Sequence, residues 1–99
     1  MNLSPKEALI LKQLIQAGSS ELYGLEMVRA SENALKMGTI YVTLARLQEK
    51  GFVESRREDD PQQAVPRRLY KITGVGRRTY LAWEAAMATF NAKINGAYA

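Results

Sequence analysis

The chain has 99 residues, an apolar content of 46% and a formal net charge of +4. That length suits one domain with a modest core, which oligomerisation can supplement. The sequence contains no cysteine and no histidine, so it lacks disulfides, thiolate metal sites and the commonest general base; we expect no enzyme, no cofactor and no metal. Without a membrane-length apolar run or a signal-peptide pattern, we expect a cytoplasmic protein with no membrane partner.

The basic residues are concentrated in the middle of the chain. Residues 1–35 contain three basic and four acidic side chains, whereas residues 36–71 contain eight basic and five acidic ones. A local excess of this kind indicates an anionic partner.

The first helix is predicted to begin after Ser4. Pro5 suits the first helical position, and Glu7 completes a capping box with Ser4. The aliphatic residues that follow cover more than one face, so we expect burial on two sides, one in the domain core and one against a partner subunit. Leu9 and Ile10 are the residues we expect at that partner contact.

A short second helix is predicted over residues 22–30. Gly24 is unfavourable in a helix interior, and its position near the start indicates a close backbone approach instead. A linker over residues 31–36 leads to the next helix, which makes a helix-turn-helix arrangement.

The helix predicted from Leu35 to Gly51 organises the rest of the chain. Ile40, Leu44 and Leu47 form one narrow apolar stripe, and Gly51 ends the helix. The opposite face is short, polar and partly basic, with Thr39, Val42, Thr43, Arg46 and Lys50. Such a face is typical of a DNA recognition helix, although an ordinary amphipathic surface helix is the alternative.

A β-hairpin is predicted next, with strands over residues 52–58 and 67–72 and a polar, proline-bounded loop over residues 59–66. Val53 suits burial, and four arginines gather near the tip: Arg56, Arg57, Arg67 and Arg68. They can reach phosphates or a minor groove as a wing. Alternatively, they pair with nearby carboxylates in a solvated hairpin. Those carboxylates are Glu54, Glu58, Asp59 and Asp60.

The last helix is predicted to begin after Thr73, which can cap it. Its large side chains follow a heptad spacing: Tyr80, Trp83, Met87, Phe90 and Ile94. That stripe favours an intersubunit contact, while packing on its own domain is the alternative. We therefore expect a winged-helix domain over residues 1–73 and a dimerisation helix over residues 74–99, packed on the first helix as one compact unit.

The order of these elements is that of a winged helix-turn-helix, an α+β fold that is mainly α, with a two-stranded hairpin wing. Four stretches resemble the PadR family of bacterial transcriptional regulators. Residues 22–26 resemble its Tyr-Gly-Tyr-Glu motif, with Leu25 in place of a frequent aromatic. Residues 38–47 resemble its Gly-Thr-hydrophobic-Tyr and Leu-x-Arg-Leu signature, which residues 49–53 continue. Residues 66–77 resemble its wing strand and the opening of its last helix.

The resemblance covers roughly residues 5 to 80 and implies a homodimeric repressor on a pseudo-palindromic operator. It also implies a short family member, whose last helix contacts the first helix of the partner. Some short members bind planar aromatic or cationic molecules between subunits, so a small aromatic effector is a further candidate partner, with Trp83 and Phe90 as candidate contacts.

For double-stranded DNA, we expect Thr39, Val42 and Thr43 to face bases in the major groove. We expect Lys36 and Tyr41 to anchor phosphates, with packing of the helix as an alternative role for Tyr41, and Arg46 to read a base or clamp the backbone. The residues expected to steady the wing on the DNA are Arg56, Arg57, Arg67 and Arg68. A winged helix that binds protein instead is a third hypothesis, supported by the acidic wing tip at residues 58–60.

Overall fold

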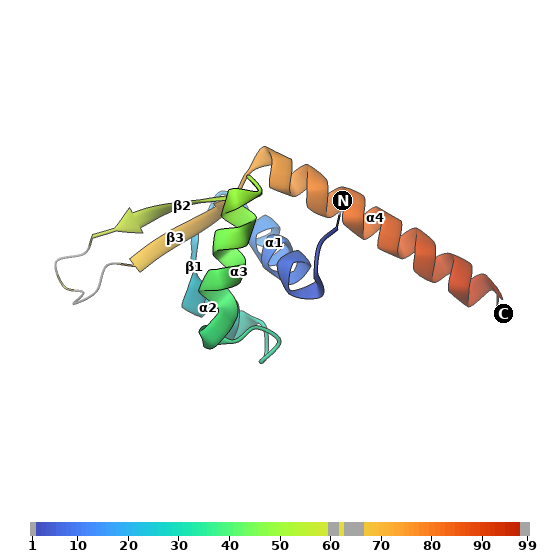
Figure 1. Ribbon diagram of the computed structural model, residues 1–99, viewed down its shortest axis with the longest axis horizontal. Coiled ribbons are helices and arrows are strands. Elements are labelled where there is room, and N and C mark those ends of the chain that lie inside the picture. Colours follow the sequence, from blue (N-terminus) through green and yellow to red (C-terminus); the bar gives the residue numbers. More distant parts are fainter. Residues whose placement is uncertain (1, 60–61, 63–66, 98–99) are drawn as a thin grey trace.

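The structure is a computed structural model that describes residues 2–59, 62 and 67–97, with residues 94–97 as backbone only. Its elements are α1 (Pro5–Gln16), β1 (Leu22–Tyr23), α2 (Gly24–Ala30), α3 (Met37–Glu49), β2 (Val53–Glu58), β3 (Arg67–Ile72) and α4 (Gly74–Ala97). Figure 1 shows the β2–β3 hairpin and α4 extending from the helical body in opposite directions. The predicted winged helix, mainly α with a C-terminal helix, is confirmed.

The sheet has three strands rather than the two expected. It is antiparallel with the order β1-β3-β2, and β1 pairs Leu22 with Tyr70 and Tyr23 with Leu69. The predicted helix over residues 22–30 is therefore wrong at Leu22 and Tyr23, which form β1. The backbone of Tyr23 is extended, and its N–H donates to Glu26 Oε1 at 2.8 Å, so α2 begins only at Gly24.

The predicted helix ends are confirmed at several places. Glu7 N–H donates to Ser4 Oγ at 3.1 Å, and Ser4 N–H donates to Glu7 Oε1 at 2.9 Å. Gly51 follows α3 with a φ of 79°, in the left-handed region that favours glycine after a helix. Gly76 N–H donates to the capping Thr73 hydroxyl at 3.0 Å.

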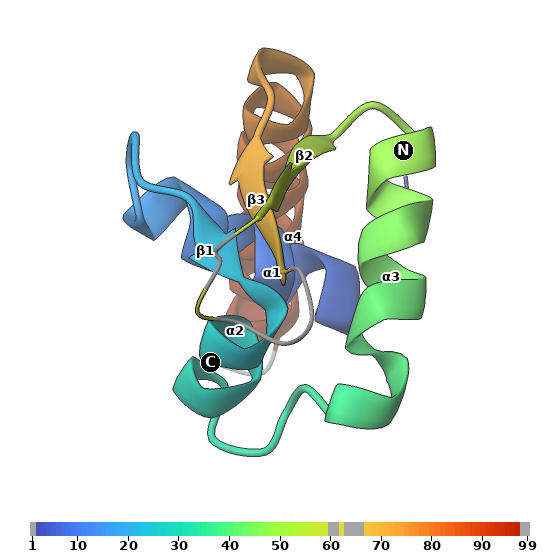
Figure 2. The same ribbon diagram turned by 90° about the vertical axis from the view of Figure 1, so that its left-hand side faces the viewer.

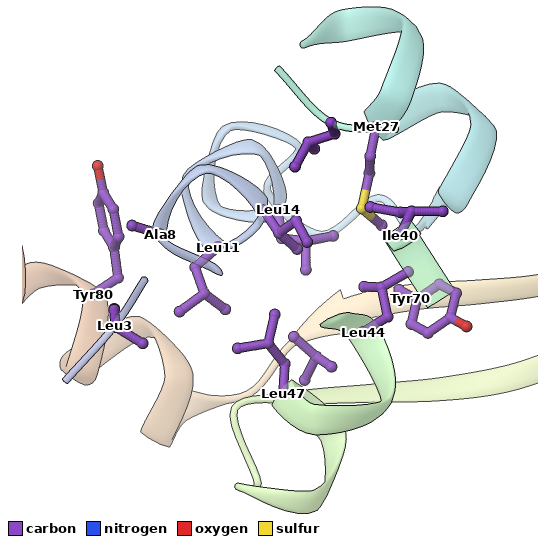
Figure 3. Close-up of a cluster of buried hydrophobic side chains, with 13 residues drawn as sticks. Leu3, Ala8, Leu11, Leu14, Met27, Ile40, Leu44, Leu47, Tyr70 and Tyr80 are labelled. Atoms are coloured by element: carbon purple, nitrogen blue, oxygen red, sulfur yellow. The ribbon is translucent and has the colours of Figure 1, made fainter. Parts of the chain in front are cut away.

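The core lies where α1, α2, α3 and the sheet meet, and Figure 3 shows its side chains converging from all of them. The predicted stripe of α3 is buried completely, with Ile40, Leu44 and Leu47 at most 1% exposed. Val53 is buried as expected. Burial of this stripe fixes which face of α3 looks outward.

The structure corrects two residues expected at a dimer contact. Ile10 is fully buried in the core of its own chain. Tyr80 is also buried, and its hydroxyl donates to Glu84 Oε2 at 2.8 Å. Both side chains therefore have little or no exposed surface to offer a partner, because both belong to the core of their own chain, where α4 packs on α1. Within the described ranges, no helix combines the length and hydropathy that crossing a membrane requires.

Candidate nucleic-acid interface

The outward face of α3 is open to solvent, and Figure 2 shows this helix standing along one side of the molecule. Thr39 and Arg46 are exposed, and the side chain of Val42 is 54% exposed. Thr43 is half-buried, and its hydroxyl donates to the Thr39 carbonyl of its own helix at 3.2 Å. Val42 and Thr39 are therefore better placed to meet a ligand than Thr43.

The residues directly opposite the buried stripe include positions that the sequence analysis missed. By the helical period these are Gly38, Val42, Ala45 and Glu49, and all four are exposed. A Cβ added at Gly38 would meet no other atom within 4 Å, so a ligand backbone can approach closely there. A helical projection of the predicted helix would have identified Gly38 and Ala45.

Tyr41 joins α3 to α2 through Gly24. A Cβ at Gly24 would lie 2.9 Å from Cε1 of the Tyr41 ring. The predicted close approach at Gly24 is therefore confirmed, and the partner is the aromatic ring. Tyr41 is still 48% exposed, so the same side chain braces the helix and reaches the surface.

The turn before α3 places Lys36 at the helix entrance. Ser31 Oγ donates to the Val28 carbonyl at 2.7 Å and accepts the Leu35 N–H at 2.9 Å. Leu35 is buried, and Lys36 follows as the exposed N-cap residue. Lys36 therefore adds a positive charge at the N-terminal end of α3, where the helix dipole is also positive.

A polar chain connects α3 to the wing. Ser55 Oγ donates to Gln48 Oε1 at 2.8 Å, and Arg68 Nη1 donates to Ser55 Oγ at 3.1 Å. Tyr41 and Arg68 line the same groove between α3 and the sheet. The guanidinium of Arg68 is thus held beside α3.

The wing arginines divide between the two faces of the sheet. Arg57 lies opposite Arg68 in the register, and Ser55 lies opposite Tyr70. Because residues that alternate along a strand share a face and opposite residues do too, Arg57 and Arg68 lie on the α3 face. Arg56 lies on the other face.

That other face holds Arg56 and Arg67 in ion pairs. Arg56 Nε donates to both carboxylate oxygens of Glu21 at 3.0 Å, which raises the pKa of the Arg56 guanidinium further. Arg67 pairs with Glu58 at 3.3 Å and stacks 4.2 Å from the centre of the Tyr23 ring. These two arginines therefore stabilise the wing on the sheet face that points away from α3.

The predicted alternative of paired wing arginines is confirmed in part. Arg67 pairs with Glu58, and Arg57 pairs with Asp59 at 2.9 Å. Glu54 instead pairs with Lys71. Asp60 lies outside the described residues.

Across α3 from the wing, Lys50 pairs with Glu7 at 2.9 Å. Burial raises the pKa of Glu7, but the hydrogen bond from the Ser4 backbone and the Lys50 ammonium together outweigh it, so this pKa lies below its usual value. Among the described residues, Lys36, Arg46 and Arg68 have no carboxylate partner. The cations expected at DNA that remain uncompensated therefore surround α3.

A second surface runs along α4. Met87 and Phe90 are 40% and 56% exposed, whereas Trp83 and Leu9 are half-buried against the core. The rings of Trp83 and Tyr80 lie 6.0 Å apart, centre to centre. The side chain of Ile94, also expected here, lies outside those described.

Residues 10–82 match the family model of the transcriptional regulator PadR-like family. The chain belongs to this family. A PadR-like transcription factor from Bacteroides fragilis shares 23% identity and a TM-score of 0.78, over 92% of this chain and 87% of its own. A PadR family regulator from hypervirulent Clostridium difficile shares 23% identity and a TM-score of 0.75, over 94% and 97%.

Another structure with the PadR-like fold is that of Bacillus subtilis PadR, solved in complex with operator DNA. It shares 20% identity and a TM-score of 0.71, over 83% of this chain and 48% of its own. An uncharacterised protein of Methanocaldococcus jannaschii is 34% identical over 59 residues, which are 60% of this chain. The chain spans about half the length of this curated relative, since the match covers 48% of it.

Proposed function

We propose that the chain is a homodimeric, sequence-specific repressor that inserts α3 into the major groove of a pseudo-palindromic operator. The observation that carries the proposal is the division of α3 into a buried stripe of Ile40, Leu44 and Leu47 and an open opposite face. The operator complex of Bacillus subtilis PadR, a structure of the same fold, supports DNA as the ligand.

Side-chain chemistry assigns different tasks to the residues around α3. The exposed methyl groups of Val42 suit a thymine methyl, and the Thr39 hydroxyl suits a base edge. Lys36, Tyr41 and Arg46 suit phosphates, which position the helix without reading sequence. From the wing, Arg57 and Arg68 contribute on the α3 face.

A dimer would present two α3 helices to two half-sites. We assign the contact to the exposed Met87 and Phe90 of α4, with the half-buried Leu9 and Trp83 beside them. A two-fold dimer of this class reads half-sites about 34–36 Å apart, one helical turn of DNA. Repression then follows because the bound dimer occludes a promoter.

Fluorescence anisotropy with three labelled duplexes tests DNA binding. The first duplex comes from the DNA upstream of the gene that encodes this chain, the second is selected by the wild-type protein from a random pool, and the third is scrambled. Val42→Ala should change the preference at one base position by about 1 kcal/mol without altering the salt dependence. Arg46→Ala should weaken binding to all duplexes and lower the salt slope by about 1 for each phosphate that Arg46 neutralises in the wild type. Equal, weak binding of every duplex by the wild type would contradict the proposal and favour a protein-binding winged helix.

The dimer is tested by sedimentation velocity over a dilution series. Phe90→Glu should produce monomers, because a carboxylate at a buried apolar contact loses its hydration without gaining a partner. Val75→Glu is the matched control, since Val75 is similarly exposed at 48% but lies at the start of α4. A wild-type protein that sediments as a monomer at all concentrations would remove the dimer from the proposal.

A second candidate function is control by a planar aromatic or cationic effector between the last helices. Its support is that Trp83 and Phe90 lie on one side of α4 by helical spacing, with Phe90 exposed. Stacking should quench Trp83, the single tryptophan of the chain. The test is a titration with phenolic acids and cationic dyes, and unchanged emission and unchanged DNA affinity across that panel would reject the candidate.

A further inference from the structure

A groove lies on the side of α3 away from the wing, between this helix and the start of α1. Lys6 of α1 lines it together with Thr39, Val42, Thr43 and Arg46 of α3. Figure 1 shows α3 between the β2–β3 hairpin on one side and α1 on the other. The wing groove and this α1 groove therefore flank the same helix.

The α1 groove carries uncompensated positive charge. Among the described residues, neither Lys6 nor Arg46 has a carboxylate partner. Glu7 also lines the groove, but its Oε1 accepts the Ser4 N–H and its Oε2 accepts the Lys50 ammonium. The side chain of Glu7 is only 10% exposed, so its carboxylate is largely shielded from the groove and its charge is compensated by Lys50.

A helix in the major groove has a phosphate backbone on each of its two flanks, because both strands border that groove. On the wing flank, Arg68 is held beside α3 by Ser55. On the other flank, Lys6 and Arg46 are the cations that the α1 groove offers, with the exposed Thr39 between the two elements. Each of the two grooves beside α3 thus offers cations to one of the two DNA strands that border the major groove.

We propose that the α1 groove is a phosphate subsite in which Lys6, together with Arg46, holds the backbone of the DNA strand opposite the one that the wing meets. The inference rests on the proposed function, since it requires α3 to enter a major groove. Lys6 takes no part in the core or in the capping box of α1, which Ser4 and Glu7 complete between themselves. Its side chain is therefore free to serve a ligand.

The test measures affinity against salt concentration on the duplex that the wild-type protein selects from a random pool, and on a scrambled duplex. Lys6→Ala should lower affinity for both duplexes and reduce the salt slope by about 1 for each Lys6 in the complex. From 50 to 200 mM salt, the ratio of wild-type to variant affinity should shrink about 3.5-fold for each phosphate that Lys6 neutralises. Lys6→Arg should restore the slope.

Lys12→Ala is the matched control, because Lys12 is exposed on the same helix without a partner among the described residues and does not line the groove. It should leave the salt slope unchanged. Phosphate ethylation interference identifies the strand that Lys6 contacts. A phosphate that matters to the wild type should cease to matter in Lys6→Ala, and within the same half-site it should lie on the strand opposite the one affected by Arg68→Ala.

A wild-type slope in Lys6→Ala, an equal reduction in Lys12→Ala, or Lys6 and Arg68 phosphates on the same strand of one half-site would each overturn the inference while DNA binding stands. A wild-type protein that binds neither duplex would instead overturn the proposed function, and the inference with it.

Discussion

Gly76→Ala tests how closely the start of α4 is seated on the turn that follows α3. A Cβ at position 76 would lie 2.0 Å from the Phe52 carbonyl oxygen and 3.0 Å from Ile72 Cγ1. That carbonyl accepts the Thr73 N–H at 3.0 Å, so the methyl group must displace hydrogen-bonded backbone. Such overpacking costs about 3 kcal/mol, and the better helix propensity of alanine offsets about 1 kcal/mol. We expect a net destabilisation of about 2 kcal/mol, which lowers Tm by about 8–16 °C.

Thermal melts followed by circular dichroism at one fixed protein concentration measure this destabilisation, since association would make Tm depend on concentration. Gly38→Ala is the matched control, because it adds the same methyl group within a helix where no atom lies within 4 Å. Its Tm should equal or exceed that of the wild type. If Gly76→Ala has the same Tm as Gly38→Ala, the packing of α4 does not need the close approach at Gly76.

Three further substitutions probe other contacts. Glu7→Gln keeps a capping side chain but removes the ion pair to Lys50. Because folding lowers the pKa of Glu7, this stabilisation is present above the pKa of the unfolded chain and is lost as pH falls through the folded one. The variant should be about 0.5–1 kcal/mol less stable near neutral pH, with the gap closing in acid; urea unfolding across pH measures it, and a constant gap would contradict it. Tyr23→Phe removes the hydroxyl that donates to Glu58 at 2.6 Å, which should cost about 1 kcal/mol in urea unfolding and speed hydrogen exchange at the ends of β2 and β3 next to the wing tip; unchanged exchange there would count against this role. Leu44→Ala empties a fully buried position and should lower the free energy of unfolding by about 2–5 kcal/mol in urea titrations, so a decrease well below that range would speak against a continuous core.

Features governed by neighbouring residues could be predicted well. The capping box of Ser4 and Glu7 and the glycine at position 51 depend on atoms within one helical turn. The stripe of Ile40, Leu44 and Leu47 repeats within a single helix. Helical periodicity and cap chemistry are local, so these predictions needed no knowledge of the rest of the fold.

The candidate site could be predicted only as a set of residue types. The spacing placed Val42 and Arg46 on the polar side of α3, and both are exposed. Spacing could not separate the wing arginines by use, because Arg56 meets Glu21 from a distant loop. The pairing of Glu21 with Arg56 exists only once β1 has joined the sheet beside β3.

The order of the residues alone determines the helical class, the register of the apolar stripe on α3, and the basic excess in the middle of the chain. The fold alone decides that Ile10 and Tyr80 lie in the core, and that Lys6 shares a groove with Arg46. The physical reason is range. Periodicity, capping and turn chemistry act between residues close along the chain, whereas burial and charge pairing depend on which distant segments the packing brings together.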